Sequence, residues 1–169
     1  EIDNSDPSAL IVINSALANG YMAFPHETID RHPDFRIIAA AYTLGKCCVL
    51  QYVGSYALDA ATLDRFDNIF FDYDRKLEEC LYPSEEVLKF MWSFRDAVLK
   101  TKIPHVVSTR GIGKVYKKDQ RGIPVNDILT SNVVKNLSQD DVNTVIGNMS
   151  DINSSNKFYS GIKQLVLRR

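Results

Sequence analysis

The pattern of apolar and polar residues changes about halfway along the chain. Up to residue 75, helical and strand-like segments alternate: a helix over 7–19, a short β-hairpin over 21–30, and two apolar runs over 35–41 and 69–71. These runs are almost free of polar residues, which is typical of strands covered on both faces, as in a parallel sheet between helices. The alternation therefore predicts an α/β fold.

After Pro83 the apolar residues follow a helical spacing only. Ser84 is a suitable start for a long helix because its hydroxyl can accept a hydrogen bond from an unpaired amide, and glutamates follow it. Shorter helices are predicted over about 108–118, 125–136 and 138–149. Ser138 and Asp141 have the spacing of a capping box at the start of the last one. This half is therefore predicted to be all α.

This change of pattern places a domain boundary near residues 75–83. We expect residues 1–78 to form the α/β part and residues 79–150 to form a small helical domain. The remaining residues, 151–169, are expected to be a C-terminal tail, in which the apolar residues from Phe158 onwards make a docked helix.

Composition and charge exclude several classes of protein. The chain has 169 residues, of which 45% are hydrophobic, so it is neither disordered nor a disulfide-rich miniprotein. Its 20 basic and 21 acidic residues nearly balance, which argues against binding to nucleic acid or anionic lipid. No apolar run approaches the ~20 residues of a membrane span. Cys47, Cys48 and Cys80 lack the spacing of a metal site and are expected to be reduced thiols in a cytoplasmic protein.

The common catalytic and phosphate-binding patterns are missing from the sequence. His26, His32 and His105 are scattered, without acidic or cysteine residues at ligand spacing, so no metal site is predicted. Gly45-Lys46 and Gly113-Lys114 lack the preceding glycine and the following Ser or Thr of a Walker A loop. The sequence therefore offers no Walker A cradle for ATP.

Four segments of the first half share their order and spacing with a known family. They are 1–4, 16–25, 32–39 and 52–66. Together they resemble the C-terminal part of an AAA+ ATPase of the MoxR/CobS-like, dynein-related branch, which includes phage and prophage members. In that branch a Walker B strand ending in Asp-Glu-x-Asp precedes a helix, a hairpin, a His-Pro-Asp-Phe-Arg strand and a Leu-Asp-x-Ala-x-Leu-Asp-Arg-Phe helix. The resemblance covers residues 1–75 well and 76–150 loosely.

The resemblance implies the second half of a P-loop NTPase core, followed by a small all-α lid domain. It implies ATP and Mg²⁺ in the intact parent protein, a hexameric ring of subunits and an unidentified protein that the ring remodels. Glu1 would match the Walker B glutamate, because a carboxylate orients the attacking water and accepts its proton. The alternative for Glu1 is an exposed terminal charge.

Two arginines match positions that contact phosphate in this family. Arg65 lies near the end of a short helix that Asp59 begins, and it matches the arginine finger that reaches the γ-phosphate of a neighbouring subunit. An ion pair with Asp64 or Asp67 is the alternative for Arg65. Arg110 matches the sensor 2 arginine, which contacts nucleotide in its own subunit, and a surface position on a helix is its alternative.

The sensor 1 position departs from the family. Its relatives have Ala-Thr-Ala-Asn-Thr where this chain has Ala-Ala-Ala followed by Tyr42 and Thr43. An asparagine amide holds the attacking water there, whereas Tyr42 has a bulky ring and a more distant hydroxyl. Thr43 is the candidate substitute. Altered sensing in an active ATPase and a degenerate ATPase both fit this departure.

Two functions follow from these observations. In the first, the parent couples ATP binding and hydrolysis to remodelling of a protein, and this chain alone is inactive and needs no cofactor because it has no Walker A loop. In the second, the chain is a non-catalytic oligomerisation or scaffold module derived from an AAA+ domain. The coding sequence upstream of Glu1 distinguishes them: a Walker A loop favours the first and a nearby start codon the second.

Overall fold

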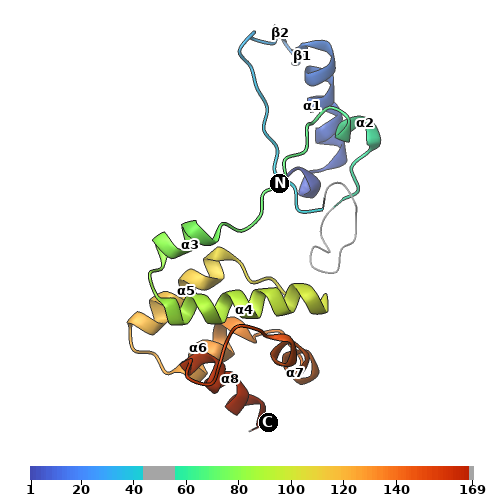
Figure 1. Ribbon diagram of the computed structural model, residues 1–169. Coiled ribbons are helices and arrows are strands. Elements are labelled where there is room, and N and C mark those ends of the chain that lie inside the picture. Colours follow the sequence, from blue (N-terminus) through green and yellow to red (C-terminus); the bar gives the residue numbers. More distant parts are fainter. Residues whose placement is uncertain (44–55, 168–169) are drawn as a thin grey trace. The chain divides into compact units, whose positions relative to one another are not determined.

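The computed structural model describes residues 1–43 and 56–167 (Figure 1). The chain divides into two compact units, Glu1–Phe70 and Phe71–Arg169. In the first unit the described elements are η1 (Ile2–Asn4), α1 (Pro7–Asn19), β1 (Tyr21–Ala23), β2 (Thr28–Asp30) and α2 (Ala60–Leu63). The second unit contains α3 (Arg75–Leu81), α4 (Glu85–Thr101), α5 (Thr109–Gln120), α6 (Val125–Ile128), the π-helical turn η2 (Leu129–Val133), α7 (Gln139–Asn148) and α8 (Lys157–Leu167).

Local sequence signals explain the regular elements of the first unit. The Asp6 carboxylate begins α1 by accepting a hydrogen bond from the Ser8 amide at 2.7 Å. Gly20 ends α1 in the left-handed conformation (φ 75°), which glycine adopts without a steric penalty. Strands β1 and β2 then pair antiparallel, with Met22 opposite Ile29. The predicted helix and hairpin are thus confirmed.

The predicted α/β fold with a parallel sheet is wrong. Within the described residues the sheet has two antiparallel strands, β1 and β2, and the runs 35–41 and 69–71 have no regular secondary structure. Both runs contain almost fully exposed side chains: Ile38 is 97% exposed and Phe71 is 98% exposed. A strand needs neighbours that pair its amides and carbonyls. No described segment forms a ladder with these runs, so the parallel-sheet core of a P-loop NTPase is not present in the described residues.

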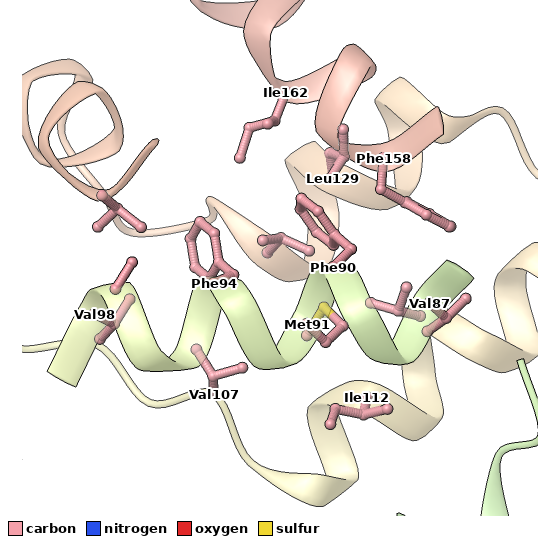
Figure 2. Packing of buried hydrophobic residues seen from close by; sticks show 14 of the residues in the cluster. Val87, Phe90, Met91, Phe94, Val98, Val107, Ile112, Leu129, Phe158 and Ile162 are labelled. Carbon is pink, nitrogen blue, oxygen red and sulfur yellow. The ribbon is translucent and has the colours of Figure 1, made fainter. Parts of the chain in front are cut away.

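Helix α4 is the centre of the second unit. The Ser84 hydroxyl begins it, as predicted, by accepting from the Val87 amide at 3.4 Å. The helix ends where Lys102 adopts a left-handed conformation (φ 56°). In Figure 2, Phe90 and Phe94 lie on the side of α4 that faces Phe158 of α8. The Phe90 and Phe158 rings stack with their centroids 5.6 Å apart.

The opposite side of α4 is covered as well. Figure 2 shows Met91 on the side of α4 toward Val107 and Ile112, and all three side chains are buried. Helix α5, which carries Ile112, therefore packs on one side of α4, and α8 on the other. Burial on both sides explains why α4 has apolar residues over such a wide part of its surface.

Helices α7 and α8 follow their predicted signals, whereas α3 was not predicted: the Asp74 carboxylate begins it by accepting from the Lys76 and Leu77 amides. Ser138 and Asp141 form the expected capping box at the start of α7. Phe158 and Ile162 of α8 are fully buried, so the last helix is docked as expected. No helix in the described part of the chain combines the length and the apolar character needed to cross a lipid bilayer.

Candidate functional site

Asp3 organises the best-defined polar cluster of the first unit. Its side chain is fully buried, and its Oδ2 atom accepts three hydrogen bonds from Tyr42 and Thr43. The donors are the Tyr42 amide (2.9 Å), the Thr43 amide (3.0 Å) and the Thr43 hydroxyl (3.0 Å). The backbone adds a further contact, because the Ile2 amide donates to the Ala40 carbonyl at 2.8 Å. The N-terminal turn is thus fixed to residues about 40 positions further along the chain.

Glu1 joins this cluster through its side chain. The Tyr42 hydroxyl donates to Glu1 Oε1 at 2.6 Å, and the Asn4 amide group donates to Glu1 Oε2 at 3.0 Å. Glu1 is otherwise exposed to solvent. The structure therefore brings together two of the predicted site residues, Glu1 and Thr43, with Tyr42 and Asp3 between them.

Hydrogen bonds keep both carboxylates of this cluster ionised. The hydroxyl of Tyr42, followed by the side chain of Asn4, lowers the pKa of Glu1 below its ordinary value. Burial raises the pKa of Asp3, but the hydrogen bonds from Tyr42 and Thr43 together outweigh it, so the pKa of Asp3 also lies below its ordinary value. The cluster thus presents one exposed carboxylate, Glu1, supported by a buried one.

Arg65 lies just beyond α2, which is held against α1. The Asn14 side chain of α1 donates to the buried Thr62 hydroxyl at 2.6 Å, and Asp59 caps the same helix by accepting from the Thr62 amide. Arg65 is exposed and its guanidinium donates to the Ala61 carbonyl. Among the ion pairs of the described residues, none joins Arg65 to an aspartate. The predicted alternative, an ion pair with Asp64 or Asp67, is therefore not formed in the described structure.

Arg110 belongs to the second unit and is exposed in the first turn of α5. Ser108 caps this helix by accepting from the Gly111 amide at 3.1 Å. Between them, the Thr109 hydroxyl donates to Glu78 Oε1 at 2.6 Å. The start of the helix that carries Arg110 is therefore fixed to α3.

A buried ion pair adds to this contact between α3 and its neighbouring helices. Arg95 donates to both carboxylate oxygens of Glu78, at 2.7 and 3.1 Å, and to the Val107 carbonyl at 2.7 Å. The Trp92 indole donates to Glu78 Oε2 at 2.6 Å. Burial raises the pKa of Glu78, but the donors Arg95, Thr109 and Trp92 outweigh it and leave the pKa below its ordinary value. Glu78 and Arg95 thus join α3, α4 and the start of α5.

Sequence reasoning missed Asp3, Glu78 and Arg95. The signal for Asp3 was present, because it stands two residues after Glu1, as the last acid does in the Asp-Glu-x-Asp pattern of the family that the sequence resembles. Glu78 and Arg95 are 17 positions apart on different helices, so no spacing in the sequence pairs them. A buried pair between two elements is visible only once their packing is known.

The cluster does not by itself form a metal centre. Within the described residues, no three His, Cys, Asp or Glu side chains gather closely enough to hold a metal ion. Cys80 is free and exposed, while Cys47 and Cys48 lie outside the described residues. Comparison of the chain with protein-family models, with curated proteins and with solved structures gave no match.

Proposed function

We propose that this chain is part of a cytoplasmic AAA+ ATPase, and that it contributes Glu1 to ATP hydrolysis. The parent would assemble as a ring, a hexamer in the family that the sequence resembles, and use ATP hydrolysis to remodel a protein. The proposal does not rest on a parallel sheet. It rests on one local arrangement, the contact between the N-terminal turn and residues 40–43.

This contact supports the proposal because of which residues it joins. The resemblance assigns Glu1 to the end of Walker B and Thr43 to the sensor 1 region, and these assignments were made from separate parts of the sequence. Residues 41 positions apart, Glu1 and Tyr42, meet at 2.6 Å. Hydrolysis needs a carboxylate that orients water next to a polar sensor of the phosphate, and both kinds of group are here.

Each residue has a distinct role in this proposal. The ionised Glu1 carboxylate orients the attacking water and accepts its proton. The Thr43 hydroxyl is held at the same place by Asp3. The exposed guanidinium groups of Arg65 and Arg110 neutralise phosphate charge, Arg65 toward a neighbouring subunit and Arg110 within its own. Mg²⁺ would neutralise phosphate charge when bound, but the described residues supply no complete site for it.

The direct test uses the longer protein that the proposal requires, with Walker A upstream of Glu1. Replacing Glu1 by Gln removes the base but keeps its size, so turnover is expected to fall by about 10²-fold or more while ATP binding persists. Arg65→Ala should reduce turnover by about 10³-fold or more, the range of arginine fingers. Arg31→Ala is a matched control, because Arg31 also donates to a main-chain carbonyl of the first unit.

A mixing experiment tests whether Arg65 acts between subunits. Arg65→Ala subunits mixed with Walker A-dead subunits should regain activity, since an intact pocket then faces an intact finger at some interfaces. Arg65→Lys should not restore turnover, because an ammonium lacks the planar fork of a guanidinium. Wild-type turnover in an all-Arg65→Ala ring, or in Glu1→Gln, would contradict the proposal.

A second candidate function is a non-catalytic oligomerisation module, and the exposed apolar run 69–71 favours it. Ile69, Phe70 and Phe71 are each at least 80% exposed. Contiguous apolar surface of this kind is typical of an interaction site. Light scattering at increasing concentration tests self-association: this candidate predicts that wild-type chains associate and that Phe70→Ser reduces association, without any dependence on ATP.

A further inference from the structure

Tyr42 is the residue at which the sequence departs from the family that it resembles, and the structure gives this residue two anchors. Its amide donates to the buried Asp3 carboxylate at 2.9 Å, which fixes the backbone. Its hydroxyl donates to Glu1 Oε1 at 2.6 Å, which fixes the end of the side chain. Tyr42 therefore joins a buried carboxylate, through its backbone amide, to an exposed carboxylate, through its hydroxyl.

Further hydrogen bonds on both sides of this contact hold the backbone around it in place. Thr43, the next residue, is held by two further hydrogen bonds to Asp3. The Ile2 amide donates to the Ala40 carbonyl at 2.8 Å, so the backbone on both sides of the contact is fixed. An asparagine at position 42 would end well short of Glu1, because the phenolic hydroxyl lies beyond a whole ring.

We propose that Tyr42 is a positioning residue for the Glu1 carboxylate, holding one of its oxygens through the phenolic hydroxyl so that the group keeps one orientation toward the attacking water. This inference rests on the proposed function, since it assigns Glu1 the role of base. The phenol carries out this role through Glu1 and needs no contact with ATP. The departure from asparagine is thereby a change in how the base is held, and not a loss of the site.

The first test needs no nucleotide and uses the 169-residue chain. Among the charged groups of the described residues, Asp3 acts on Glu1 and raises its pKa. Tyr42→Phe removes only the hydroxyl, so the pKa of Glu1, followed by carbon NMR of labelled glutamate, should rise. Tyr56→Phe is the matched control: it makes the same change on an exposed tyrosine of the same unit and should leave the pKa of Glu1 in place. An unchanged Glu1 pKa in Tyr42→Phe would overturn the inference.

The second test uses ATP hydrolysis by the longer protein. Tyr42→Phe should lower kcat by about tenfold, the value of one hydrogen bond to a charged group, with KM unchanged. The acidic limb of the kcat profile should move to higher pH, which a purely structural tyrosine would not cause. An active wild type with an equally active Tyr42→Phe variant would overturn this inference alone. A wild type that does not hydrolyse ATP would overturn the proposed function and this inference with it.

Discussion

Similar apolar side chains are buried in one compact unit of this chain and exposed in the other. In the second unit, Phe90, Phe94 and Phe158 are completely buried around α4. In the first unit, Phe70 is 80% exposed although it stands in an equally apolar stretch of sequence. Among the described hydrophobic residues of the first unit, Leu10 alone is buried. Hydrophobicity by itself therefore did not decide which residues form a core.

The two units differ in where the hydrogen-bond partners of their backbone groups lie along the sequence. A helix satisfies its amides within its own sequence, so an apolar helix such as α4 needs only other helices to cover it. A strand must find its hydrogen-bond partners elsewhere. The first unit is therefore held mainly by polar contacts, such as those of Asp3 with Thr43 and of Asn14 with Thr62.

The largest expected consequence is a difference in local stability. Amides in the middle of α4 should exchange with solvent only through unfolding of the whole second unit, whereas amides of α1 should exchange through local opening. We expect protection of α4 amides to exceed that of α1 amides by about 10³-fold or more. Hydrogen exchange followed residue by residue measures both in one sample. Equal protection would show that the two units unfold together.

A pair of phenylalanine substitutions tests the comparison at single residues. Phe90→Ala removes a buried ring from the centre of the second unit and should lower the free energy of unfolding by about 3–5 kcal/mol. Phe70→Ala removes an exposed ring and should change this free energy by less than about 0.5 kcal/mol. Urea denaturation measures both. A large loss in Phe70→Ala would mean that the run 69–71 is covered in solution.

Most helix positions were predicted from the sequence because their signals are local, although α3 was missed and the helix expected over 125–136 is α6 followed by the π-helical turn η2. Ser84, Ser138 and Asp141 each act within one turn of the helix that they begin. The runs 35–41 and 69–71 were predicted as strands from composition alone, and composition does not specify what pairs with a strand. For the same reason the candidate site was predicted only in part. Glu1 and Thr43 stand at motif positions of the family that the sequence resembles, whereas the link between them through Asp3 depends on a tertiary contact.

The buried ion pair of the second unit gives the next prediction. Glu78→Ala leaves the Arg95 guanidinium buried without its carboxylate and should cost about 3–5 kcal/mol of unfolding free energy. Replacing both residues, as Glu78→Leu with Arg95→Met, should restore most of this loss, since no charge is then left unpaired. Urea denaturation of the three variants is the measurement. A double variant no more stable than Glu78→Ala would show that the loss comes from Trp92 and Thr109, the other donors to Glu78, and not from the unpaired charge.

The same pair makes the second unit sensitive to acid. The pKa of Glu78 in the folded chain lies below its ordinary value, so its contribution to stability is present above the unfolded pKa of about 4.5. It is lost as the pH falls through the lowered folded pKa, because protonation then releases Arg95. Denaturation midpoints measured from pH 6 downwards should therefore fall for the wild type. The double variant Glu78→Leu with Arg95→Met should show a shallower fall.

Helix caps give the smallest expected effect, and they allow a direct comparison because both units contain capped helices. Ser138→Ala removes the capping box of α7 and should lower the unfolding free energy of the second unit by about 1 kcal/mol. Asp6→Ala removes the cap of α1, but the loss should appear as faster exchange of the α1 amides and not in the unfolding of the second unit. Thr144→Ala and Ser15→Ala, inside the same two helices, are the controls. If Asp6→Ala shifted the denaturation of both units equally, the two units would unfold as one cooperative structure. The contrast between a unit with a packed apolar core and a unit held by polar contacts would then be wrong.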